Sequence, residues 1–329
     1  MNNRYAHAAA SCLMLIALTA AADAAAWQTI VDEHFAADPS PAWSYTGRQN
    51  AASQDLIRWD SVAGNLAAEW DQSNHYADWS GAGFLDPYQI APSHYSRALG
   101  VTLSDADSFK FGARLRINSV ANTTEFYQAA CFGLYGLADM GPDRCMSDNF
   151  SNNATIIKDG SDFVEFDYFI QNDSFGWNPM TQATIGAHIA GLDGDCTVGS
   201  GGDPLWHNTD MGAGHWLPAG TDLYVEVAYD AATRRANSTI YADPGLTEVL
   251  SVNGVGQYYS TAPLPADKHF TLTDVAFWNY VGANWGGANG QGNGAFDDLY
   301  VMKLVPEPAS AMVLIAGLLA ACRTRRRPA

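Results

Sequence analysis

The chain has 329 residues, of which 35 are acidic and 17 are basic, so its formal net charge is −18 at pH 7. A protein this acidic repels nucleic acid and anionic membrane surfaces, and we expect neither as a partner. Cations, neutral sugars and basic proteins remain compatible with the charge, which also favours solubility outside the cell.

The first 26 residues are typical of a secretory signal peptide. Arg4 precedes an apolar run over residues 12–22, and three alanines at 24–26 supply a small-residue cleavage site before Trp27. A core helix would carry polar residues at helical spacing, and residues 13–18 have none. We therefore expect residues 1–26 to be a signal and the protein to be exported.

Residues 27–305 have the pattern of one all-β domain. In residues 108–118 apolar side chains alternate with lysine, arginine and glycine, which is typical of a strand with one buried and one wet face. Residues 222–229 and 236–242 flank a short turn, as in a β-hairpin. Other strands are predicted at residues 29–35, 65–70, 98–103, 131–137, 163–170, 184–190, 270–278 and 296–304. More than ten short strands separated by turn residues predict a two-sheet antiparallel sandwich.

Four segments of this region are similar to the concanavalin A-like, laminin-G-type jelly roll. They are DSFKF at 107–111, DFVEFDY at 162–168, LYVEVAYD at 223–230 and FDDLYV at 296–301. The resemblance implies a jelly-roll sandwich over residues 27–305. Because that fold carries lectins, glycosidases and adhesive spacers, it leaves the function open.

Glu165 and Asp167 lie on the mixed face of the strand at 163–170 and suggest a catalytic alternative. Retaining β-glucanases of the jelly-roll class carry Glu-x-Asp-x-x-Glu, or a version one residue longer, because retaining hydrolysis needs two carboxyl groups about 5 to 5.5 Å apart. Here Ile170 or Gln171 stands where the third acid would be. We expect no catalysis, and instead two solvated or hydrogen-bonded acids on a half-exposed strand.

Aromatic residues among polar loop residues are the candidate ligand-binding residues. Sugar rings stack on flat aromatic faces, and the best-placed side chains are Trp79, Trp206, Trp216 and Trp285, with Trp278 close to the last. These residues predict an extracellular polysaccharide as ligand.

No cofactor is expected, apart from a structural calcium ion as an open alternative. Calcium takes six to eight oxygen ligands, and Asp193, Asp195 and Asp203 could supply some of them. A second acidic loop runs from residue 289 to Asp297 and Asp298. Neither loop matches the twelve-residue EF-hand spacing, and both could instead cap their own backbone turns.

Three cysteines lie outside the two terminal signals, and in an oxidising compartment one disulfide is expected. The sequence allows three pairings. We favour Cys131 with Cys145, because they flank a turn-rich loop that could return the chain to its starting strand, which leaves Cys196 as a thiol.

The tail from residue 306 onward has three parts in order. Pro306, Glu307 and Pro308 form a box, residues 311–322 are apolar, and a cluster that includes Arg325, Arg326 and Arg327 follows. The tail resembles the PEP-CTERM sorting signal of Gram-negative bacteria, which is read by an exosortase, a membrane protease. The apolar run has 12 residues, whereas a spanning helix needs about 20, so we expect a transient inner-membrane anchor.

Together these features predict a signal peptide (1–26), a β-sandwich (27–305) and a sorting tail (306–329). The expected protein is an exported, non-catalytic glycan-binding or structural module of the cell surface or extracellular matrix. An exosortase-type protease is its expected processing partner. The alternative is a glycoside hydrolase that uses Glu165 and Asp167.

Overall fold

The structure is a computed structural model that describes residues 25–46, 57–69, 93–121, 127–137, 157–158, 162–171, 182–190, 195–196, 217–261, 263–279 and 291–306. Contacts within the chain define two compact units, Ile30–Val301 and a smaller one from the two chain ends. The hydrophobic core belongs to the larger unit.

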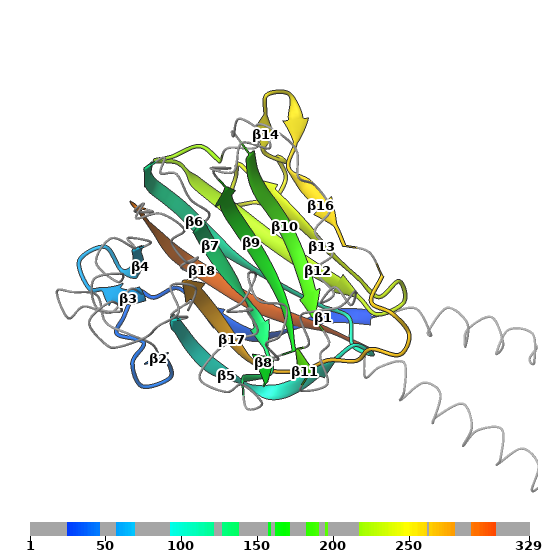
Figure 1. Cartoon of the computed structure of the whole chain (residues 1–329). Coiled ribbons are helices and arrows are strands. Elements are labelled where there is room, and N and C mark those ends of the chain that lie inside the picture. Colours follow the sequence, from blue (N-terminus) through cyan, green and yellow to red (C-terminus); the bar gives the residue numbers. More distant parts are fainter. Residues whose placement is uncertain are drawn as a thin grey trace, which may run out of the picture. The chain divides into compact units, whose positions relative to one another are not determined.

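The first of two main sheets has eight strands in the order β16-β13-β12-β6-β18-β4-β3, with β1 paired to β18 (Figure 1). Its strands are β1 (Ala25–Glu33), β3 (Ile57–Asp60), β4 (Asn65–Glu69), β6 (Phe109–Ala121), β12 (Asp222–Asp230), β13 (Arg235–Tyr241), β16 (Tyr258–Ser260) and β18 (Gln291–Pro306).

The second main sheet has six strands in the order β10-β9-β7-β17-β5-β2. Its strands are β2 (Ser44–Thr46), β5 (Ser93–Ser104), β7 (Tyr127–Tyr135), β9 (Phe163–Gln171), β10 (Gln182–Ala190) and β17 (Thr271–Asn279). Two small ribbons pair β8 (Ile157–Lys158) with β11 (Asp195–Cys196), and β14 (Ser251–Val252) with β15 (Val255–Gly256).

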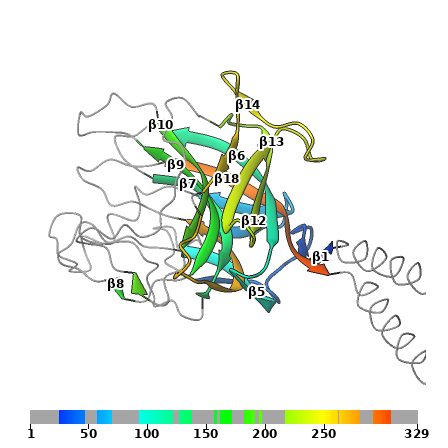
Figure 2. The ribbon, with the colours of Figure 1, turned by 90° about the vertical axis from the view of Figure 1, so that its right-hand side faces the viewer.

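The chain crosses repeatedly between the sheets, for example from β5 to β6, from β6 to β7 and from β17 to β18. Every strand pair whose register is described runs antiparallel. Figure 2 shows strands of both sheets from the side. This is the all-β, two-sheet antiparallel jelly-roll sandwich that the sequence predicts.

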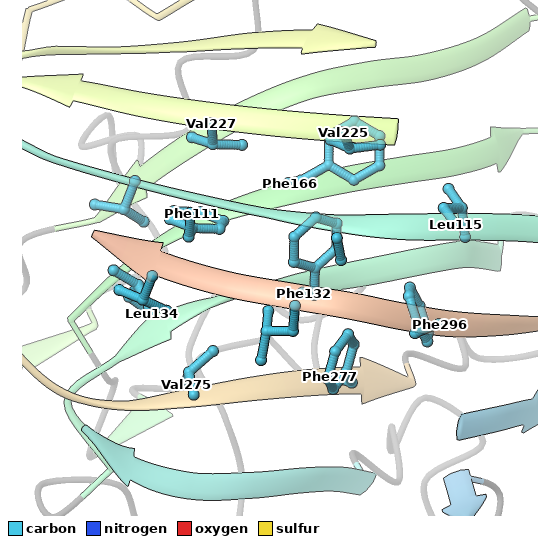
Figure 3. Packing of buried hydrophobic residues seen from close by; sticks show 14 of the residues in the cluster. Phe111, Leu115, Phe132, Leu134, Phe166, Val225, Val227, Val275, Phe277 and Phe296 are labelled. Atoms are coloured by element: carbon cyan, nitrogen blue, oxygen red, sulfur yellow. The ribbon is translucent and has the colours of Figure 1, made fainter. Parts of the chain in front are cut away.

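Phenylalanines fill the centre of the core between the sheets (Figure 3). The Phe132 ring on β7 lies 5.7 Å from the Phe166 ring in its own sheet, and 5.8 and 6.1 Å from the rings of Phe111 and Phe296 in the other sheet. All four side chains are fully buried. Aromatic pairs of this kind contribute about 0.5–1.5 kcal/mol each beyond the apolar area they bury, so Phe132 joins the two sheets.

Arg234 fixes the crossover that leads from β16 to β17. Its backbone has a left-handed φ of 55°, and its guanidinium donates to the carbonyl oxygens of Leu264 and Pro265 at 3.0 and 2.9 Å. It also pairs with Asp105 Oδ2 at 2.7 Å, which ties the crossover to the turn between β5 and β6.

The longer predicted strands are confirmed, and so is the hairpin, in which β12 pairs with β13. On β12 every second residue, Leu223, Val225, Val227 and Tyr229, is buried. The short strands β2, β3 and β14–β16 were not predicted, because two to four residues show no clear period.

The predicted signal peptide and sorting tail lie almost wholly outside the described residues. Within the described ranges, no helix is long and apolar enough to span a membrane.

Candidate functional site

The face of the six-stranded sheet that points away from the core carries a second set of buried side chains. Cys131 and Tyr135 on β7, Phe163 and Glu165 on β9, and Trp278 on β17 are at most 4% exposed, yet none belongs to the hydrophobic core cluster. Their strand neighbours, such as Phe132 and Phe166, point into the core instead. Because side chains alternate across a strand, the first set must occupy the outward face.

Strand register brings these outward residues together. Gly133 lies opposite Glu165 on β9 and opposite Ala276 on β17, and two residues further along, on the same face, Cys131 lies opposite Trp278. Trp278 is in turn opposite His94 on β5. The face therefore combines residues from four adjacent strands.

Glu165 is fully buried and its carboxylate is hydrogen-bonded. The Tyr135 hydroxyl donates to Oε2 at 2.8 Å, and Cys131 Sγ lies 3.4 Å from the same oxygen. Gly133 makes this arrangement possible, since a Cβ there would approach the Glu165 Cα and Cβ to 2.6 Å. A buried carboxylate needs such partners, because an unsatisfied one would carry a large desolvation cost.

Trp278 forms the aromatic centre of this face. Its ring lies 4.5 Å from the His94 ring and 5.2 Å from the Tyr135 ring. Burial lowers the pKa of His94 to about 4, so its imidazole is neutral at pH 7 and presents one donor and one acceptor nitrogen.

The expectation of a half-exposed Glu165 is wrong, while the expected hydrogen bonding is present. Alternation correctly separates the two faces of β9, but both faces of this strand hold buried side chains. The side chains of Asp167, Ile170 and Gln171 lie outside the described part. Backbone register places Asp167 opposite Cys131 and Gly186.

The four predicted ligand-binding tryptophans, Trp79, Trp206, Trp216 and Trp285, lie outside the described residues. The strand ends that flank them are nevertheless placed. Ser93, which follows the segment with Trp79, is paired with Asn279, which precedes the segment with Trp285. That pair adjoins the pair of His94 and Trp278, so one end of each segment meets the six-stranded sheet beside the Trp278 face. The other ends adjoin β4 and β18 of the eight-stranded sheet.

Leu217, the residue after Trp216, is also close to this end of the sheet. Its amide donates to the Tyr168 hydroxyl at 3.2 Å, and Tyr168 lies opposite Ala130, next to Cys131, on β7. The three segments that hold the four tryptophans thus each have one flanking residue near this end of the six-stranded sheet.

The predicted metal and disulfide residues are only partly described. Asp193 and Asp203 lie outside the described ranges, and Asp195 is placed only by its backbone in β11. Within the placed parts of the chain, no group of three His, Cys, Asp or Glu side chains is arranged to hold a metal ion. Cys145 is not described, so its pairing with Cys131 stays a prediction. Of the sorting residues only Pro306, the end of β18, is placed.

The grouping of Cys131, Tyr135, Glu165 and His94 was not predicted. Alternation along residues 131–135 and 276–278 could have assigned Cys131, Tyr135 and Trp278 to one side of their strands. Which strands are neighbours is a tertiary fact that no local pattern contains.

A scan against protein-family models and a search of curated proteins find no match. Among solved structures, basic winged bean lectin with Tn-antigen is similar at a TM-score of 0.45 and 10% identity, covering 85% of this chain and 99% of that one. Lectin II from Ulex europaeus (TM-score 0.43, 11% identity, 86% and 99%) and the Emp47p carbohydrate recognition domain (0.40, 9%, 84% and 96%) are also similar. These TM-scores are too low to assign a family or a ligand, so the sandwich assignment rests on the strand pairing itself.

Proposed function

We propose that the protein is a non-catalytic glycan-binding module. The observation that carries this proposal is the pairing of Ser93 with Asn279, which joins the segments of Trp79 and Trp285 to the sheet beside the buried Trp278 and His94. Aromatic side chains on segments that end beside one another can bind sugar rings by stacking, and neutral polar groups nearby can add hydrogen bonds.

The burial of Glu165 supports a binding role over hydrolysis. A general acid must reach the glycosidic oxygen, and a fully buried side chain whose carboxylate accepts a hydrogen bond from Tyr135 does not offer that access. The hydrolase alternative makes a clear prediction. Cleavage of laminarin that Glu165→Gln abolishes and Trp27→Ala preserves would establish catalysis and overturn the non-catalytic proposal.

Binding is tested with a glycan array probed by the purified protein, with and without calcium. We expect Trp79→Ala and Trp285→Ala to weaken binding roughly 3- to 10-fold each, as the loss of one stacking contact predicts. Trp27→Ala is the matched control, because Trp27 is an exposed tryptophan on β1 of the other sheet. Calcium dependence that is lost in Asp193→Asn or Asp203→Asn would assign the metal site. Equal binding by all the tryptophan variants would contradict the proposal.

Export and sorting form the second part of the proposal. We expect residues 1–26 to be removed on export and an exosortase-type protease to cleave near Pro308, which would release the protein to the cell surface or extracellular matrix. Intact-mass analysis of the protein from its native host tests this. An exported form that still carries Arg325, Arg326 and Arg327 would contradict it.

A further inference from the structure

The outward face of the eight-stranded sheet carries a band of tyrosines. On β12, Val225 and Val227 point into the core, so Tyr224 and Glu226 point outward. Tyr224 is paired with Tyr241 on β13. Glu226 is paired with Thr239, which is paired with Tyr258 on β16.

Glu226, on the β12 side of this band, is held in a fixed orientation. The Tyr300 hydroxyl donates to Glu226 Oε2 at 2.6 Å, and Lys110 Nζ lies 2.9 Å from the same oxygen. The Tyr300 ring crosses the sheet over Gly112, where a Cβ would meet the ring and its hydroxyl at 2.6 to 2.7 Å. Burial and the nearby Glu226 raise the pKa of Tyr300, so it remains a hydrogen-bond donor.

The positive charges beside the band are paired with carboxylates. Arg114 binds Asp222, Asp297 and Asp298, and Arg116 also binds Asp222, at 3.2 Å. Both guanidinium groups are therefore neutralised by carboxylates, and the chain has a net charge of −18. For these reasons this face attracts an anionic polymer only weakly. A neutral ligand rich in hydroxyl groups fits these charges better.

We propose that Tyr224, Tyr241 and Tyr258, together with Glu226, form a second glycan-binding surface that takes a neutral polysaccharide. Three adjacent strands place these rings over roughly 10 Å, since neighbouring strands are about 4.8 Å apart. The rings offer stacking faces, and Thr239 offers a hydroxyl for sugar hydroxyls. The Glu226 side chain is 17% exposed, with Oε2 already bound to Tyr300 and Lys110, so only its Oε1 is left as an acceptor for the ligand. Tyr258 is 69% exposed, so the band is accessible at that end.

The consequence is that one molecule can bind two glycan chains. The tyrosine band lies on the outward face of β12, β13 and β16, whereas the segments with Trp79 and Trp285 connect β4 to β5 and β17 to β18. A single domain with two separate binding surfaces is divalent and cross-links polysaccharide without forming an oligomer. The ligand class follows from the proposed function, but the surface and its residues are separate from it.

The test is an array of neutral and uronic-acid-containing oligosaccharides, probed with the full protein and with Tyr241→Ala, Tyr258→Ala and the double variant. We expect dissociation constants for neutral glycans to rise roughly 3- to 10-fold for each ring removed. Tyr258→Phe should keep the affinity, because it keeps the ring. Ser260→Ala, on the same strand and face, is the matched control and should bind as the unaltered protein does. Thermal unfolding of each variant checks that the sandwich is intact.

The outcomes separate this inference from the proposed function. If neutral glycans lose binding only in Trp79→Ala and Trp285→Ala, the tyrosine band is overturned and the first site stands. If the tyrosine variants halve the binding stoichiometry and stop the cross-linking of glycan-coated beads, the second surface is supported. Binding confined to anionic glycans, or no glycan binding at all, overturns it.

Discussion

Replacing Tyr135 with phenylalanine tests whether Glu165 is a buried acid held by its neighbours. The change removes the hydroxyl that donates to Glu165 Oε2 at 2.8 Å and leaves the ring beside Trp278 in place. A hydrogen bond to a charged group contributes about 1.5–3 kcal/mol, and solvent does not replace this one where both side chains are fully buried. For a domain of this size, each kcal/mol corresponds to about 2–4 °C in Tm, so we expect a loss of roughly 3–12 °C.

Differential scanning calorimetry measures this loss, with Tyr258→Phe as the control. Tyr258 is 69% exposed, so removal of its hydroxyl should leave the Tm unchanged. The double variant Tyr135→Phe/Glu165→Gln should lose less than the sum of the single variants, because both act on one hydrogen bond. A Tm for Tyr135→Phe within 1 °C of the unaltered protein would refute the reasoning and indicate that water reaches Glu165.

Four further predictions concern the core, the crossover, one histidine and the cysteines. Phe132→Ala should destabilise the fold by about 3–5 kcal/mol in urea unfolding, because the cavity would lie between the sheets, and an effect below 1 kcal/mol would contradict that position. Arg234→Lys should cost about 2–4 kcal/mol, because one ammonium cannot replace a guanidinium bound to three carbonyls and a carboxylate, and an unchanged urea midpoint would contradict the crossover contacts. The pKa of His94 is lowered in the folded protein to about 4, so protonation of His94 favours the unfolded state. The free energy of unfolding should therefore fall by up to about 3 kcal/mol from pH 6.5 to pH 4. The His94→Gln variant should lose this part of the pH dependence. Non-reducing peptide mapping should join Cys131 to Cys145, and a bridge to Cys196 would show that different loops meet.

The sequence predicts those strands that have one buried face and one solvent-exposed face. Alternation locates β6, β12 and β13 to within a few residues, because a shift of one position would expose every apolar side chain. It does not predict the burial of Glu165, because that depends on which strands are neighbours and on what covers their second face.

Asp297 and Asp298 illustrate a second limit of pattern reasoning. Strict alternation would point one of these consecutive acids into the core. In the structure both carboxylates bind Arg114 on the outward side, and Asp298 has a left-handed φ of 49°. A non-glycine residue with positive φ is uncommon, although aspartate tolerates it better than most, so this irregularity of β18 could not be derived from a period of two.

Side chains on the two outward faces of the sandwich therefore differ in how deeply they are buried, and substitutions on the two faces should have different effects. On the six-stranded sheet, Tyr135, Glu165 and Trp278 are buried, so changing them should alter stability and binding together. On the eight-stranded sheet, Tyr258 is largely exposed, so changing it should alter binding alone. Measuring Tm and glycan affinity on the same variants thus distinguishes a residue that supports the sheet from one that contacts the ligand. A variant of Tyr258 that lowered the Tm by as much as Tyr135→Phe would contradict this division, because it would place the tyrosine band within the packed structure rather than on its surface.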